Sequence, residues 1–152
     1  MKKRGFGFKD AVRGICHAVL CERNFRVHIV AMLAVIYFAS VFGVDWTEKA
    51  ILAIVIACVM AAELVNTAIE AVVDKLSPER CTYARIAKDC AAGAVFVLAV
   101  GAVFVAIAVF DEVEGWMRIF RYIKEEYIKL IIFALLGTVF IFAKLKDKEK
   151  SE

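Results

Sequence analysis

The chain has 152 residues, of which 62% are hydrophobic, a single proline and a net charge of +3. A water-soluble domain of this length is rarely so apolar, because its surface must be covered with polar groups, so the composition favours an integral membrane protein. Seven of the first 26 residues are basic, but no aromatic or glycine-rich recognition module accompanies them, which argues against a nucleic-acid partner.

The first predicted element is an amphipathic helix that precedes the first long apolar stretch. Apolar residues recur there at helical spacing, and basic residues fall on another face at steps of four. A helix of this kind lies along a membrane surface with its basic face toward anionic headgroups. The apolar positions are Phe8, Val12, Ile15 and Val19, and the basic face carries Lys9, Arg13 and His17.

Four apolar stretches follow. At about 1.5 Å of rise per residue, the first three are long enough for a hydrocarbon core of about 30 Å. The fourth has only 14 residues, but Lys129 and Lys144 flank it and can extend to the two interfaces. The stretches run from Val27 to Val44, Ala50 to about Val73, Cys90 to Phe110, and Leu130 to Ala143. We therefore predict an all-α integral membrane protein with an amino-terminal surface helix, three transmembrane helices and a fourth.

The distribution of lysine and arginine predicts the orientation. Cytoplasmic segments carry an excess of these residues, which places the amino terminus, the connection around residues 75–88 and the lysine-rich tail inside. The short connection from Asp45 to Lys49 and the acidic stretch from Asp111 to Glu114 then lie outside. Both termini are predicted to be cytoplasmic.

The second apolar stretch contains ionisable residues that require an explanation. With successive helical residues about 100° apart, its polar side chains fall within an arc of roughly 100°. A carboxylate within a bilayer costs at least ~2.5 kcal/mol, so this stripe implies a compensating metal, cation or water. A purely structural polar interface between helices is the alternative. The stripe consists of Glu63, Asn66, Thr67, Glu70 and Asp74.

Further charged residues stand at the same predicted face of the membrane. Lys88 and Asp89 precede the third apolar stretch, and Glu22, Arg23 and Arg26 precede the first. Such a set can hold a divalent ion, contact polyphosphate and accept a proton from a hydroxyl. No Walker-type GxxxxGK[ST], HRD or HExxH motif is present, so a nucleotide would be bound without a soluble phosphate-binding fold.

These motifs resemble those of the small prokaryotic diacylglycerol kinase family, which includes the undecaprenol kinases of Gram-positive bacteria. The resemblance covers about residues 5–110 and is carried by three segments, Glu22 to Arg26, Glu63 to Asp74 and Ala87 to Ala94. It implies a homotrimer with shared active sites that transfers the γ-phosphate of ATP to a membrane lipid alcohol with Mg²⁺. Residues 1–110 would form the lipid kinase domain, and residues 111–152 a carboxy-terminal extension with an extra transmembrane helix.

The resemblance also implies a role for individual residues. Glu63 would be the catalytic base, Asn66 would position the reacting groups, and Glu22 and Glu70 would bind Mg²⁺. The implied nucleotide-binding residues are Asp10, Glu22, Glu70, Asp74, Glu79, Lys88 and Asp89, and the implied lipid contacts are Glu63 and Arg26. Arg80, beside Glu79, departs from the aromatic residue expected there.

Two lipid alcohols are candidates for the acceptor. The segment from Glu22 to His28 is more similar to the undecaprenol kinase branch, so undecaprenol is favoured and diacylglycerol is the alternative. The enzyme would lie in the bacterial cytoplasmic membrane with its active site facing the cytoplasm. A small cation-conducting or structural membrane subunit is the alternative of another class, but the one-sided placement of the polar cluster is unfavourable for an ion path.

Overall fold

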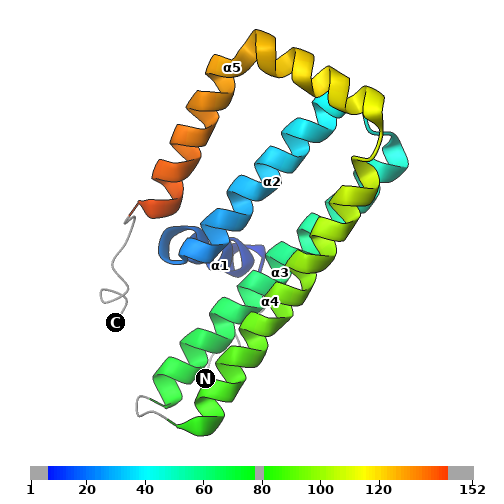
Figure 1. Cartoon of the computed structure of the whole chain (residues 1–152). Coiled ribbons are helices and arrows are strands. Elements are labelled where there is room, and N and C mark those ends of the chain that lie inside the picture. The colour runs from blue at the N-terminus through cyan, green and yellow to red at the C-terminus, as the bar shows by residue number, and fades with distance from the viewer. Residues whose placement is uncertain (1–6, 78–80, 144–152) are drawn as a thin grey trace.

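The computed structural model describes residues 7–77 and 81–143, and within these ranges the chain forms helices and no strand (Figure 1). The predicted all-α class is confirmed. The predicted surface helix is α1, and it is followed by four longer helices. Their bounds are α1 (Phe8–Cys21), α2 (Arg23–Phe42), α3 (Trp46–Leu76), α4 (Thr82–Val109) and α5 (Val113–Phe142).

Three of the described helices, α2, α3 and α4, are long and apolar enough to cross a membrane, as predicted. The 31 residues of α3 correspond to about 46 Å of helix, which exceeds the bilayer core by about 15 Å. In Figure 1, α3 and α4 extend beyond α2 at the end where Leu76 and Thr82 lie. This end contains the charged residues Glu70, Asp74 and Lys88.

The carboxy-terminal helix α5 is divided by a bend at Glu126, whose φ of −124° and ψ of 22° are not helical. Its first part crosses one end of the bundle, and its second part runs beside α2 (Figure 1). Among the described helices α5 is not one of those apolar enough to span, because Glu125, Glu126 and Lys129 precede a short apolar segment. The fourth span stays a prediction.

The α2–α3 and α4–α5 connections, which are predicted to lie outside the membrane on the same side, meet at one end of the bundle. The ring of Phe42, at the end of α2, lies 5.1 Å from that of Phe110 and 6.0 Å from that of Trp116, both edge-on. Between them, Asp45 and Glu48 form a capping box at the start of α3, with bonds of 2.8 and 2.7 Å. These contacts fix the α2–α3 turn against the start of α5.

Polar bonds also attach α5 to α2. Arg118 Nε donates to the carbonyl oxygen of Phe42 at 2.9 Å, and the hydroxyl of Tyr37 donates to that of Tyr122 at 2.8 Å. Gly115 lies so close to Phe42 that a Cβ at this position would stand 2.3 Å from the ring. The carboxy-terminal extension is therefore packed into the helical domain.

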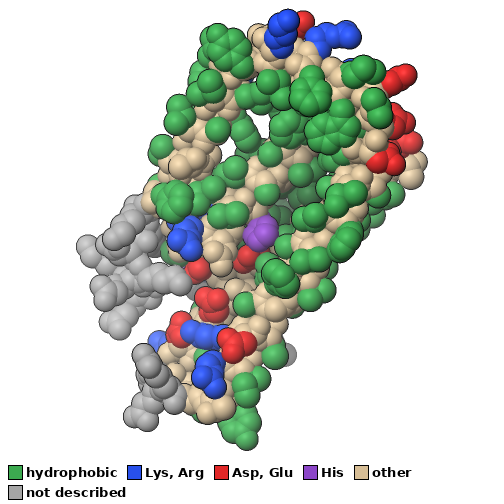
Figure 2. Space-filling view, viewed as in Figure 1, with side chains coloured by type: hydrophobic (Ala, Val, Ile, Leu, Met, Phe, Trp, Pro, Cys, Tyr) green, Lys and Arg blue, Asp and Glu red, His purple; other side chains and the backbone are tan. Residues whose placement is uncertain are grey.

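The described surface is rich in large apolar side chains. Phe96, Phe104 and Ile107 on α4 are exposed to more than half of their area, and Phe8 on α1 is 87% exposed. On the face drawn in Figure 2, hydrophobic side chains cover most of the helices, and charged side chains gather at the upper end and over the lower half, from the histidine downward. Such a surface is favourable in contact with lipid or with another subunit, in agreement with a membrane protein.

We expect Gly115→Ala to destabilise the protein, because the added methyl group displaces the buried Phe42 ring from its aromatic neighbours. The expected loss is about 1–3 kcal/mol, read as a lower midpoint of thermal unfolding in detergent. Gly101→Ala is the matched control, since no heavy atom lies within 4 Å of its added Cβ. Equal midpoints for the two variants would contradict the close packing of α5 on α2.

Candidate functional site

The centre of the polar stripe is a buried carboxylate on α3. Glu63 is only 3% exposed, and its Oε1 lies 3.1 Å from Nε2 of His28 on α2. An ionised carboxylate is costly to bury without a polar partner. The pair therefore joins α2 and α3 at the depth where α3 changes from apolar to polar.

Asn66, one turn further along α3, is also buried, at 7% exposure. Its Nδ2 donates to Oε1 of Glu70 at 3.0 Å, while its Oδ1 accepts no bond from any described residue. A buried acceptor without a partner costs about 1–3 kcal/mol. Asn66 thus orients Glu70 and presents an acceptor to whatever binds beside it.

The charged residues of α3 and α4 meet where these helices approach their connection. Lys88 of α4 forms an ion pair with Asp74 of α3, so the two sequence segments that carry the predicted site are in direct contact. Asp74 and Asp89 are exposed, and the Lys88 side chain is partly covered. Glu79 lies outside the described residues.

The start of α2 completes the carboxylate cluster. Glu22 stands between α1 and α2, and both Glu22 and Glu70 interact electrostatically with Glu63. Carboxylates from two regions of the sequence therefore act on Glu63. Their mutual repulsion favours a bound cation.

A hollow of about 580 Å³ lies between α1 and the second half of α3. Asp10, Arg13 and His17 of α1 line one side, and the α3 wall is apolar except for Thr67. Asp10 pairs with Arg13 at 2.7 Å. The surface helix therefore brings charged side chains to the face of α3 that carries Thr67.

Comparison with known proteins identifies the family of this chain. The family model described as prokaryotic diacylglycerol kinase matches residues 9–110. The chain belongs to this family. The match covers α1 from its second residue through α4, so the carboxylate cluster lies inside it and α5 lies outside it.

Curated relatives carry two names. A diacylglycerol kinase of Synechocystis sp. is 43% identical over 64% of this chain and 57% of its own length. An undecaprenol kinase of Bacillus subtilis is 37% identical over 68% of this chain and 84% of its own length. A diacylglycerol kinase of Escherichia coli is 33% identical over 68% of this chain and 81% of its own length. No solved structure matches the chain at a significant level.

The structure gives Arg26 surroundings that the sequence did not predict. This residue, expected to contact lipid, is 6% exposed and donates to backbone carbonyls at the ends of two other helices. Its Nη1 bonds Val19 O at 3.1 Å and Leu20 O at 3.3 Å, and its Nε and Nη2 each bond Ile141 O at 3.2 Å. Helix carboxyl ends leave such carbonyls without intrahelical donors, so Arg26 joins the ends of α1 and α5.

Sequence reasoning missed His28 as a site residue. It was noted only as part of a segment that distinguishes two branches of the family, yet its ring contacts the buried Glu63. The available signal was a histidine at the start of an apolar span, where a polar side chain needs a partner. The partner could not be identified, because the spacing of 35 positions between the two residues says nothing about their distance.

The donor chemistry of the cluster fits a magnesium ion. Among the described residues no three His, Cys, Asp or Glu side chains form a ready-made metal site. Mg²⁺ commonly takes only one or two carboxylates from a protein and completes its shell with water and substrate phosphates. Glu22 and Glu70 supply hard oxygen ligands of this kind, and the Asn66 side chain, whose Oδ1 has no partner among the described residues, bonds Glu70.

We expect Arg26→Gln to lower the thermal unfolding midpoint by removing bonds to α1 and α5 at once. Each lost hydrogen bond to this charged group costs about 1.5–3 kcal/mol, and Arg26→Lys should recover only part of the loss. Arg23→Gln, an exposed position on the same helix, is the control. If Arg26→Gln instead has the same unfolding midpoint as the native protein and changes only the dependence of activity on lipid, this arginine contacts the lipid and does not hold the helices together.

Proposed function

We propose that this protein is an ATP-dependent lipid kinase that transfers the γ-phosphate to the hydroxyl group of a membrane lipid alcohol. Membership of the diacylglycerol kinase family supports the reaction class. The observation that carries the assignment of residues is the buried Glu63 on a membrane-spanning helix, in contact with His28 of the neighbouring helix. A carboxylate at this depth can meet a hydroxyl that the bilayer delivers.

Glu63 is the catalytic base in this proposal. Its carboxylate accepts the proton of the lipid hydroxyl, the alcohol oxygen bonds to the γ-phosphorus, and the bond from that phosphorus to the bridging oxygen breaks. ADP leaves with the bridging oxygen. Positioning and charge neutralisation provide most of the catalysis in phosphoryl transfer, so a small set of helix-borne side chains is sufficient.

The remaining polar residues form the nucleotide side of the site. Glu22 and Glu70 would hold Mg²⁺, which when bound neutralises phosphate charge. Asn66 fixes the orientation of Glu70 through its 3.0 Å bond. Lys88, oriented by Asp74, is placed to contact phosphate oxygens, and Asp10 and Asp89 stand at the edge where a nucleotide would enter.

Undecaprenol is the favoured acceptor in this proposal, with diacylglycerol as the alternative. The segment from Glu22 to His28 supports undecaprenol, and the Bacillus subtilis relative bears that name. The Synechocystis and Escherichia coli relatives are named for diacylglycerol. A direct comparison of both lipids is therefore part of the first experiment.

We expect the native protein to transfer labelled γ-phosphate from ATP to undecaprenol faster than to diacylglycerol, and chelation of Mg²⁺ to stop both reactions. Glu63→Gln should lower kcat by about 10²–10⁴-fold, because the amide cannot accept the proton. Glu125→Gln, an exposed acid on α5, should keep the native rate. Failure of the folded native protein to label either lipid would overturn the proposed function.

The protein would act as a homotrimer with shared active sites in the bacterial cytoplasmic membrane. The exposed apolar faces of α3 and α4 are suited to contacts between subunits. Native mass measurement in lipid nanodiscs should give three chains per particle. An active monomer would contradict this assembly.

The predicted orientation can be tested at Cys81, which is exposed just before α4. Bonds from the backbone N–H groups of Ala84 and Tyr83 lower the pKa of the Cys81 thiol below its ordinary value. More thiolate is then present near neutral pH. The rate at which an impermeant maleimide labels Cys81 should therefore be high near neutral pH and should decrease only at lower pH. With Cys81 as the single cysteine, labelling is expected in inverted vesicles and not in right-side-out cells. A single cysteine at Glu112 should show the reverse pattern.

A further inference from the structure

Two hollows adjoin at the end of the bundle opposite the carboxylate cluster. The first is a groove of about 510 Å³ between α2 and α3, and the second is a polar hollow of about 360 Å³ between α2 and α5. Ser40 of α2 lines both of them. Lys49, in the lining of the groove, precedes Glu63 on α3 by about 21 Å of helix. These hollows are therefore separate from the site described above.

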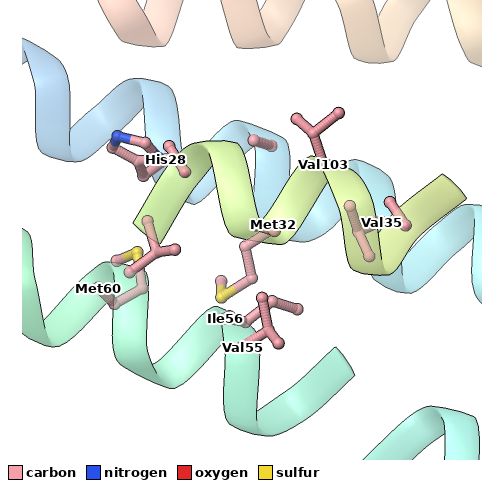
Figure 3. A pocket seen from close by; sticks show the side chains of 12 residues that line it. His28, Met32, Val35, Val55, Ile56, Met60 and Val103 are labelled. Atoms are coloured by element: carbon pink, nitrogen blue, oxygen red, sulfur yellow. The ribbon is translucent and has the colours of Figure 1, made fainter. Parts of the chain in front are cut away.

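The α2–α3 groove is polar at one end only. Ser40 and Lys49 lie where α2 ends and α3 begins, and the other lining residues are alanine, valine, leucine and isoleucine. Val35 and Ile56 lie deeper, about 8 Å and 11 Å farther along their helices. Both also line the neighbouring apolar cavity that Figure 3 shows. A groove of this kind matches an amphiphile whose headgroup stays at the end of the bundle.

The α2–α5 hollow carries positive charge. Arg118 and Arg121 of α5 line it, together with one acidic residue, Glu125. Within the described part of the chain, neither arginine forms an ion pair with a carboxylate, and the same is true of Lys49. The two adjoining hollows thus combine three basic side chains with one acidic side chain.

Other acidic residues near this end do not oppose these basic groups. Asp45 and Glu48 accept backbone N–H groups in the capping box of α3. Glu126 pairs with Lys129 at 2.9 Å. The acidic residues of the stretch 111–114 line neither hollow. The charge in the two hollows therefore favours an anionic ligand.

Aromatic side chains place this end at a membrane–water interface, where Trp and Tyr are enriched at the level of the headgroups. Both tryptophans of the chain, Trp46 and Trp116, lie here and are 84% and 45% exposed. Tyr122 lines the α2–α5 hollow, and its hydroxyl oxygen accepts a bond from Tyr37 at 2.8 Å. The O–H of Tyr122 is then left to donate to another acceptor.

We propose that an anionic phospholipid of the leaflet opposite the carboxylate cluster binds here. Its phosphate lies at Arg118, Arg121 and Tyr122, and one acyl chain lies in the α2–α3 groove, which begins at Ser40. Arginine forms strong, charge-assisted bonds to phosphate. The lipid would join α2 and α3 to α5, which lies outside the matched family region. The proposal does not depend on the kinase function, and its tests measure binding alone.

The first test measures the affinity of fluorescent phosphatidylglycerol and phosphatidylcholine for the full chain in a neutral detergent. We expect phosphatidylglycerol to bind about tenfold more tightly, and Arg121→Gln to remove most of this difference, because a charge-assisted bond to phosphate is lost. Lys124→Gln should keep the native affinity, since Lys124 is exposed on the same helix and lines neither hollow. Equal affinities of the native protein for both lipids, or equal losses in the two variants, would overturn the proposal.

A second test fills the α2–α3 groove. Ala53→Phe places a ring in its lining, and Ala108→Phe places the same ring on an exposed position of α4. Native mass measurement should show less phosphatidylglycerol retained per chain in Ala53→Phe, with the same number of chains per particle in both variants. Equal retention would exclude the groove as the place of the acyl chain. A changed number of chains in Ala53→Phe alone would show that a second copy of the protein covers the groove, which also overturns the proposal.

Discussion

The structure is organised around the cost of placing the Glu63 carboxylate inside a membrane-spanning helix. The protein does not separate this group from other charges but gathers them around it: His28 contacts it directly, and Glu22 and Glu70 interact with it electrostatically. Ionised Glu22 and Glu70 repel the Glu63 carboxylate, and a bound cation would reduce this repulsion. The His28 contact offsets part of this cost and joins α2 to α3 at this depth.

The length of the α3–α4 hairpin gives the site two distinct surroundings. Because both helices extend beyond α2, the part of α3 after Glu63 carries exposed polar residues, while the part before it faces an apolar cavity. Lys88 reaches Asp74 across the two helices and keeps the charged ends together. The Glu63 carboxylate thus stands between an apolar and a charged environment.

The carboxy-terminal extension lies outside the matched family region but is not a loose appendage. Gly115 and Arg118 fix its start against Phe42, and Arg26 bonds the carbonyl of Ile141 near its end. Since the same arginine also bonds Val19 and Leu20 of α1, the extension contributes to holding the surface helix that borders the site. The described part of the extension is thus joined to α1 through the Arg26 guanidinium group.

The sequence by itself determined the helical membrane class, the three spans and the surface helix, because apolar length and helical periodicity are local properties of the chain. It also identified the stripe from Glu63 to Asp74, since residues on one helix have a fixed angular relation. Only the tertiary structure decided the partners that come from different helices, namely His28 beside Glu63, Asp74 beside Lys88, and Arg26 between α1 and α5. Distances between helices depend on how their side chains pack, and no spacing in a single sequence encodes that packing.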